Sequence, residues 1–104
     1  MTMITVLYPR GDQAKFDHEY YAATHLPLVE RHWRPHGLTS AKALRGVDGP
    51  DGSPSPYFTI ALLAFASPDA VAAALASAGT AEVMGDIANF TTVQPIIQFN
   101  EAVG

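Results

Sequence analysis

One run of the chain gathers most of the side chains that could carry chemistry: FDHEYYAATHLPL, from Phe16 to Leu28. At helical spacing, Asp17, Tyr21 and His25 lie on successive turns of one helix face. Imidazole titrates near neutral pH, so His25 is the candidate for proton transfer. Tyr21 could orient His25 or donate a hydrogen bond to a carbonyl or phenol oxygen. The spacing therefore predicts a catalytic pair, Tyr21 and His25.

A tyrosine and a histidine four residues apart on a helix also form packed, hydrogen-bonded pairs in protein cores. The functional and the core interpretation of Tyr21 and His25 therefore both stand at this point. Tyr20 faces elsewhere and is predicted to be a core residue. His18 is predicted to be a solvated residue of the first helical turn, and Asp17 to be only the helix cap.

The four histidines do not predict a metal site. His18, His25 and His32 recur every seven residues, which puts successive members about 10.5 Å apart along a helix. His32 and His36 have i,i+4 spacing, but Pro35 interrupts the helix between them. The sequence has no cysteine and no HExxH motif, and no glycine-rich phosphate loop or GxSxG serine motif. No resident cofactor is predicted, and carboxylates such as Asp86 have no partner that the sequence reveals.

Composition narrows the classes of function further. Hydrophobic residues make up 48% of the 104 residues and charged residues only 15%, with a net charge of −4. All six basic residues fall between Arg10 and Arg45, too thin a patch for nucleic-acid binding. No apolar stretch approaches the roughly 20 residues of a membrane span, and the N-terminus does not read as a signal peptide. We therefore expect a cytoplasmic protein with no nucleic-acid or membrane partner.

The elements that must position the candidate pair follow from periodicity and turn residues. Asp17 predicts a helix N-cap, and Pro27 predicts a kink because it cannot donate to the carbonyl of Ala23. The predicted strands are 2–8, 38–45, 57–65 and 91–99, and the predicted helices are 18 to 32 or 33, 68–79 and 80–88. Pro95 confines the last strand to an edge or a bulge. This order, β-α-β-β-α-β, predicts one ferredoxin-like α+β domain over residues 1–104 with a four-stranded antiparallel sheet.

Two helices on one face of such a sheet leave its other face bare. That face would carry one alternation of the third strand, either Phe58-Ile60-Leu62 or Tyr57-Ala61-Leu63-Phe65. Contiguous apolar patches of this kind usually mark interfaces. We therefore predict a homodimer in which two copies pair sheet to sheet.

The run from Phe16 to Leu28, read as F-D-x-x-Y-Y-x-x-x-H-x-P-L, resembles the first motif of the EthD family. The stretch from Asp86 to Thr91, followed by Pro95, is similar to the second. The resemblance implies a dimeric α/β-barrel and bacterial accessory proteins of oxidative catabolism, such as an ether-degrading cytochrome P450 system. Relatives of similar fold include cofactor-free monooxygenases, polyketide cyclases, lactone isomerases and haem enzymes, and fold alone does not choose among them.

These observations lead to one functional hypothesis and one alternative. The hypothesis is a small-molecule-binding protein of catabolism or secondary metabolism, whose pocket between the first helix and the sheet takes an apolar or aromatic ligand. Its chemistry would be cofactor-independent: of oxidoreductase or monooxygenase type, of cyclase or isomerase type, or simple proton transfer by His25. The alternative is a non-catalytic accessory protein that partners an oxygenase.

Overall fold

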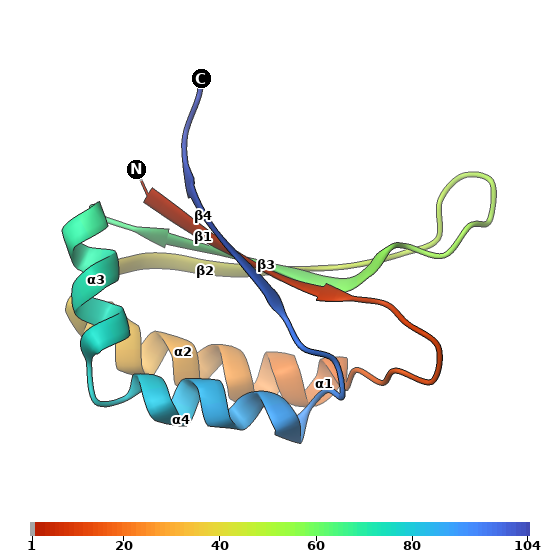
Figure 1. Cartoon of the computed structure of the whole chain (residues 1–104), viewed down its shortest axis with the longest axis horizontal. Coiled ribbons are helices and arrows are strands. Elements are labelled where there is room, and N and C mark those ends of the chain that lie inside the picture. The colour runs from red at the N-terminus through yellow and green to blue at the C-terminus, as the bar shows by residue number, and fades with distance from the viewer. Residues whose placement is uncertain (1) are drawn as a thin grey trace.

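The computed structural model describes residues 2–104, and four antiparallel strands form its single sheet. The spatial order is β2-β3-β1-β4, so the first and third strands are central, as the ferredoxin-like arrangement requires (Figure 1). The strands are β1 Thr2–Pro9, β2 Leu38–Arg45, β3 Tyr57–Phe65 and β4 Ile96–Glu101. The predicted α+β fold is confirmed.

The last strand differs from its prediction at both ends. β4 begins at Ile96, directly after Pro95, and not at Thr91. Proline lacks the N–H that a ladder needs, so pairing along β1 can start only beyond it. Thr91 instead forms an isolated bridge with Phe16. β4 lies at the sheet edge beside β1, where a short strand is tolerated.

The first helical segment runs without a break through α1 His18–Tyr20, a π-helical turn η1 Tyr21–His25 and α2 Leu26–Trp33. Asp17 caps it, because its Oδ1 accepts from the Tyr20 N–H at 3.0 Å. Where a kink was predicted at Pro27, the structure has a π turn just before the proline, in which the Leu26 N–H donates to the Tyr21 carbonyl. Pro27 cannot continue the regular ladder, and the turn before it widens to the i→i+5 pattern.

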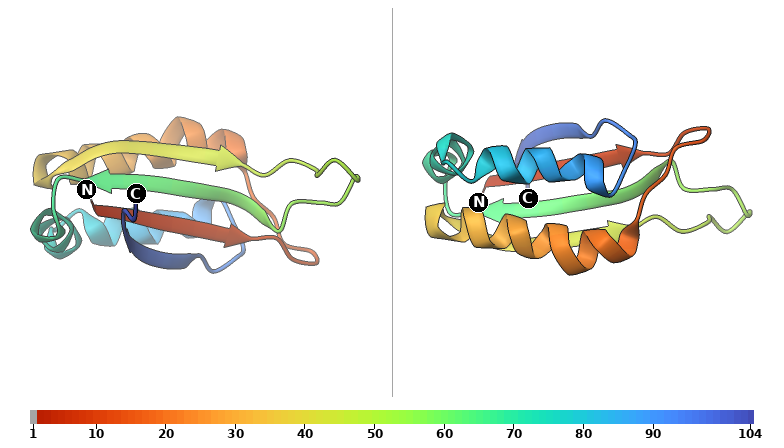
Figure 2. Two further views of the ribbon diagram at one scale, coloured as in Figure 1. Left: turned by 90° about the horizontal axis from the view of Figure 1, so that it is seen from above. Right: turned by 90° about the horizontal axis from the view of Figure 1, so that it is seen from below.

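A short 3₁₀ turn, η2 Arg34–His36, ends the first helical segment at Gly37, whose φ of 104° is in the left-handed region. The second half of the chain supplies α3 Pro68–Ala76, α4 Thr80–Gly85 and the 3₁₀ turn η3 Asp86–Asn89. α4 runs beside α2 under the same sheet face, while α3 covers one end (Figures 1 and 2). In residues 2–104 no single helix is long and apolar enough to cross a membrane; α3 with the 80–89 segment meets that test only as a pair bent by 76°.

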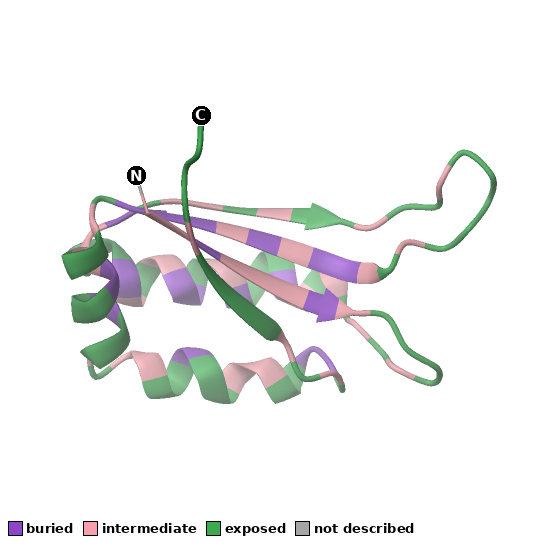
Figure 3. Ribbon diagram, turned by 45° about the horizontal axis from the view of Figure 1, so that its top comes forward, coloured by how far each residue is buried: buried purple, intermediate pink, exposed green. Residues whose placement is uncertain are grey.

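The two faces of the sheet differ in burial (Figure 3). Ala61, Leu63 and Phe65 of β3 are buried on the helix-covered side. The bare face carries the opposite alternation, including half-buried Ile60 and Leu62. Phe58 does not follow that alternation, because a register shift beside Tyr8 and Pro9 lets it pack with Phe16 near the helices. Of the two predicted sets, only Ile60 and Leu62 are therefore on the open face.

Candidate active site

A cavity of about 300 Å³ lies between the sheet and the helices. The antiparallel register builds its sheet wall, because Val6 of β1 is opposite both Ala61 of β3 and Ile97 of β4. The helix wall comes from the π turn, α2 and α4. Lining residues that are also exposed mark its mouth, at Leu75, Met84, Ile97 and Phe99. The cavity wall is almost entirely apolar, which suits a small hydrophobic ligand.

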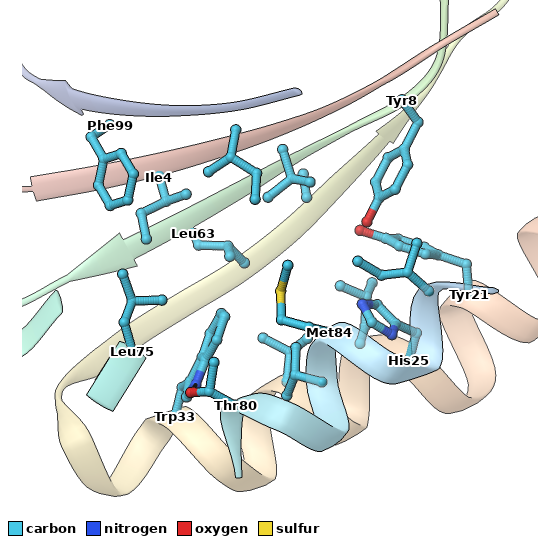
Figure 4. A pocket seen from close by; sticks show the side chains of 17 residues that line it. Ile4, Tyr8, Tyr21, His25, Trp33, Leu63, Leu75, Thr80, Met84 and Phe99 are labelled. Atoms are coloured by element: carbon cyan, nitrogen blue, oxygen red, sulfur yellow. Dashed lines mark hydrogen bonds between the residues drawn. The ribbon is translucent and has the colours of Figure 1, made fainter. Parts of the chain in front are cut away.

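Three polar side chains of the cavity, those of Tyr8, Tyr21 and His25, gather at one end, away from Trp33 and Thr80 (Figure 4). Tyr8 ends β1, while Tyr21 and His25 occupy the two ends of the π turn. All three are buried, with 2%, 3% and 4% of their surface exposed. The Tyr21 and His25 rings stack with centroids 5.4 Å apart, and the Tyr8 and Tyr21 rings meet edge to face at 5.9 Å. The π turn thus brings the predicted pair to the cavity wall.

His25 is held by a carboxylate that the sequence did not reveal. Its Nδ1 lies 2.9 Å from Oδ2 of Asp86, at the start of η3. Oδ1 of the same carboxylate accepts from the Tyr20 hydroxyl at 2.6 Å and from the Asn89 amide at 2.9 Å. With Asp86 ionised, the Nδ1 of His25 carries the hydrogen, which leaves Nε2 as the acceptor.

The protonation states follow from these surroundings. Burial lowers the pKa of His25, and the hydrogen bond to Asp86 only partly opposes that shift. Burial acts to raise the pKa of Asp86, but the hydrogen bonds from Tyr20, Asn89 and His25 outweigh it and hold that pKa below its usual value. At neutral pH the pair is therefore a neutral imidazole and a carboxylate. A neutral imidazole with a free Nε2 can accept a proton.

The two cavity tyrosines stay protonated. Burial raises the pKa of both Tyr8 and Tyr21 above the ordinary tyrosine value, and for Tyr8 the proximity of Tyr21 adds to the effect. Neither hydroxyl takes part in a side-chain hydrogen bond of residues 2–104. No fully covered side-chain polar atom of those residues lacks a partner, so both hydroxyls are open to the cavity. They are two unused donors beside His25.

Tyr20 packs against the core as predicted, stacked on Phe90, although it is only half-buried and its hydroxyl also binds Asp86. The prediction for His18 is wrong. His18 is half-buried rather than solvated, and its Nε2 lies 2.7 Å from the Thr59 hydroxyl and 3.2 Å from the Phe58 carbonyl. Both side chains reach polar groups of distant elements, and helical periodicity alone does not report such groups.

Residues 2–104 contain no group of three or more histidine, aspartate and glutamate side chains placed to hold a metal ion. Tyr21 and His25 lie together as predicted, and their chemical role stays a prediction. Tyr8 was not among the predicted site residues, because the cavity that it reaches depends on how α4 packs.

Comparison with known proteins identifies the family. The EthD domain model matches residues 10–94. This chain belongs to the EthD family. An EthD-like protein from Ralstonia eutropha JMP134 is 30% identical, over 99% of this chain and 92% of its own, with a TM-score of 0.89. An ethyl tert-butyl ether D (EthD) family protein from Bacillus halodurans C-125 is 20% identical over 99% of both chains, with a TM-score of 0.78.

The EthD fold extends to proteins of other names. An antibiotic biosynthesis monooxygenase shares it at a TM-score of 0.53 and 11% identity, over 99% of this chain and 98% of its own. At that identity the likeness shows the fold alone. A sequence search of curated proteins finds no match. Function must therefore be argued from the cavity of this EthD chain.

Proposed function

We propose that this EthD protein binds a small, largely apolar molecule in the cavity and that His25 takes a proton from it. The observation that carries the proposal is the buried His25–Asp86 pair at one end of a largely apolar cavity. A buried polar pair costs stability unless it is well bonded. Here the carboxylate has three hydrogen-bond donors, which fix the imidazole orientation.

The proton-transfer step uses only residues of the chain. A ligand proton moves to Nε2 of His25, and the imidazolium that forms lies 2.9 Å from the Asp86 carboxylate. Asp86 stabilises that charge and keeps Nδ1 protonated throughout, as the carboxylate of a hydrolytic triad does for its histidine. Tyr20 and Asn89 hold the carboxylate in place from the opposite side.

Binding of tetralin, an apolar bicyclic hydrocarbon, tests the cavity by calorimetric titration. Met84 of α4 points into the cavity (Figure 4), so Met84→Trp should fill it and weaken tetralin binding at least about tenfold by steric exclusion. Ala81→Trp adds the same ring to an exposed position of α4 that does not line the cavity, and should leave binding unchanged. If Met84→Trp binds tetralin with the wild-type affinity, the binding site lies elsewhere.

We also propose that the protein is a homodimer paired through the open sheet face. Apolar side chains there come from all four strands, namely Met3, Leu7, Leu44, Ile60, Leu62 and Ile96. Leu44 and Ile96 are 53% and 52% exposed in the single chain, which supports an occupant for this face. Charged side chains are scarce on it, so a second copy could pack there with little desolvation cost.

Native mass spectrometry of freshly purified protein tests the dimer and reports any co-purified ligand mass. Ile60→Asp should convert the dimer to a monomer, because its cross-strand neighbours Leu7 and Leu44 are apolar and the new charge would be buried unpaired in the interface. Val103→Asp, at a fully exposed position, should leave the dimer intact. A monomeric wild-type protein at micromolar concentration would contradict the proposal.

A further inference from the structure

We propose that the hydroxyls of Tyr8 and Tyr21 form an oxygen-binding subsite, and that the ligand is an uncharged, apolar ring ketone whose carbonyl oxygen accepts from both. The inference rests on the cavity of the proposed function and adds the chemical class of its ligand. Tyr8 thereby becomes a further specificity-determining residue.

The first argument is the placement of the two donors. Tyr8 and Tyr21 come from different elements, β1 and the π turn, yet their hydroxyls point toward one another at the same end of the cavity as His25 (Figure 4). Phe90 holds both rings from behind, with centroids 5.7 Å from Tyr8 and 5.1 Å from Tyr21. Rings fixed by packing lose little entropy on binding, so the two O–H groups are preorganised donors.

The second argument is what the cavity excludes. The cavity lining contains no lysine or arginine, so a carboxylate or phosphate would be desolvated without a cation to pair with it. A pure hydrocarbon would cover both hydroxyls and leave them without acceptors, which also costs free energy. A carbonyl oxygen has two lone pairs and satisfies both donors at once. An apolar body with one carbonyl therefore fits best.

The third argument is the position of His25 next to this subsite. With the carbonyl oxygen held by Tyr8 and Tyr21, an adjacent C–H bond of the ligand can break toward Nε2 of His25. Its electron pair then forms the C=C bond of an enolate, and the two phenol hydroxyls stabilise the negative charge left on oxygen. Return of the proton to carbon completes a keto–enol exchange that consumes no oxidant.

A matched pair of probes tests the subsite: 1-tetralone, which carries a conjugated carbonyl, and tetralin, which lacks it. In wild-type protein the carbonyl stretch of bound 1-tetralone should be shifted to lower frequency than in a hydrocarbon solvent. Tyr8→Phe and Tyr21→Phe should each reverse part of that shift. Each should also weaken 1-tetralone binding about fivefold to tenfold, the effect of one lost hydrogen bond. Tetralin should bind each variant at least as tightly as wild-type protein, because the hydroxyl that it leaves without an acceptor is gone. Tyr57→Phe, in a half-buried tyrosine outside the cavity, is the control.

The possible failures are distinguishable. If tetralin binds and the carbonyl stretch keeps its hydrocarbon-solvent frequency, the subsite is wrong while the cavity stands. Equal weakening of both probes in the tyrosine variants would likewise overturn the subsite, since it would indicate a packing role. If neither probe binds the wild-type protein, the cavity of the proposed function fails and the subsite fails with it.

Discussion

The interior contains two clusters that differ in chemistry although they adjoin. The aliphatic cluster joins the sheet to α2, α3 and α4 and consists of Ile4, Leu28, Val29, Trp33, Leu38, Leu63, Phe65, Val71, Ala74 and Val83. The aromatic cluster lies under the other end of the sheet and consists of Tyr8, Tyr21, Phe58 and Phe90. Only Trp33 carries a side-chain polar group in the first, whereas two of the four residues in the second carry hydroxyls.

That difference separates stability from function. In the aliphatic cluster the Trp33 Nε1–H is satisfied by the Thr80 hydroxyl at 3.0 Å, so this cluster offers a ligand apolar contacts but no free polar group. The aromatic cluster leaves two hydroxyls open to the cavity and has the His25–Asp86 pair beside it. Buried polar groups without protein partners reduce stability, so their presence at one end of the cavity indicates a role in binding. Conservative substitutions should therefore affect the two clusters differently.

The largest difference between an effect on chemistry and an effect on stability is expected for His25→Gln. Loss of a general base slows proton transfer by about 10²–10⁴-fold, measured as the exchange of the α-hydrogens of 1-tetralone for deuterium in heavy water by NMR. Gln keeps a polar side chain near Asp86, so the protein should remain folded and dimeric. Unfolding of this variant under native conditions would favour the core interpretation of Tyr21 and His25. Exchange at the wild-type rate would remove His25 from the chemistry.

Phe65→Ala should do the opposite: it should reduce stability and leave the ligand site unchanged. Phe65 has no exposed surface and packs against Trp33 with ring centroids 6.2 Å apart, so truncation leaves a cavity and costs about 3–5 kcal/mol of unfolding free energy. Urea denaturation followed by circular dichroism measures this loss. The carbonyl frequency of bound 1-tetralone should not change. Val103→Ala, at a fully exposed residue, is the control and should leave the unfolding free energy unchanged.

If Phe65→Ala fails to fold, Phe65→Leu tests the same point with a smaller loss. A shifted carbonyl frequency in a folded Phe65 variant would show that the two clusters are coupled. The division between a stabilising end and a functional end would then be wrong.

How far the sequence predicted each cluster depends on the range of the interactions. Alternation and flanking turns located β2 and β3 at their observed bounds, 38–45 and 57–65, because strand periodicity is local. The aliphatic cluster follows from those strands and from helix spacing. Pro95 predicted an edge position or a bulge for the last strand. Because proline cannot donate to the ladder, β4 begins only at Ile96.

The functional end depended on contacts that no local pattern encodes. Asp86 is 61 residues from His25 in sequence, and the two meet only because α4 lies along α2. Tyr8 reaches Tyr21 only through the packing of β1 over the π turn. The sequence therefore supplied Tyr21 and His25 from one helix, and omitted the partners that other elements bring.

The pH dependence of stability should also distinguish the aromatic cluster, which His25 adjoins, from the aliphatic cluster. The folded-state pKa of His25 lies below the ordinary value of 6.5, so the unfolded chain binds this proton more readily. Its contribution to stability is therefore complete above pH 6.5 and is lost as the pH falls from there toward the lower folded-state pKa. The lowered pKa of Asp86 adds a further loss only below its ordinary value of 3.8.

Urea unfolding at pH 7.5 and 5.5 measures the His25 contribution. Wild-type protein should be less stable at pH 5.5, and His25→Gln should reduce that difference. His36→Gln removes an exposed histidine outside both clusters and should keep the wild-type difference. If the loss of stability between pH 7.5 and 5.5 is the same in His25→Gln as in wild-type protein, another group causes the acid sensitivity.

The smallest effect is expected at the exposed link between α2 and α4. Glu82 lies 2.9 Å from Nε2 of His32 and 3.4 Å from Arg31, with its side chain 58% exposed. Exposed ion pairs contribute about 0–1 kcal/mol, so Glu82→Gln should change the unfolding free energy by no more than that.

Asp86→Asn is the matched change in the adjacent buried link, which joins η3 to the π turn, since the Asp86 side chain is only 11% exposed. Its amide can no longer stabilise a protonated imidazole, so deuterium exchange of 1-tetralone should slow, whereas Glu82→Gln should leave the exchange rate at the wild-type value. Equal exchange rates in the two variants would mean that both carboxylates only fasten segment 80–89 to the first helical segment. The proton-transfer role of the His25–Asp86 pair would then lose its support, while the cavity and its oxygen subsite would remain to be judged by probe binding.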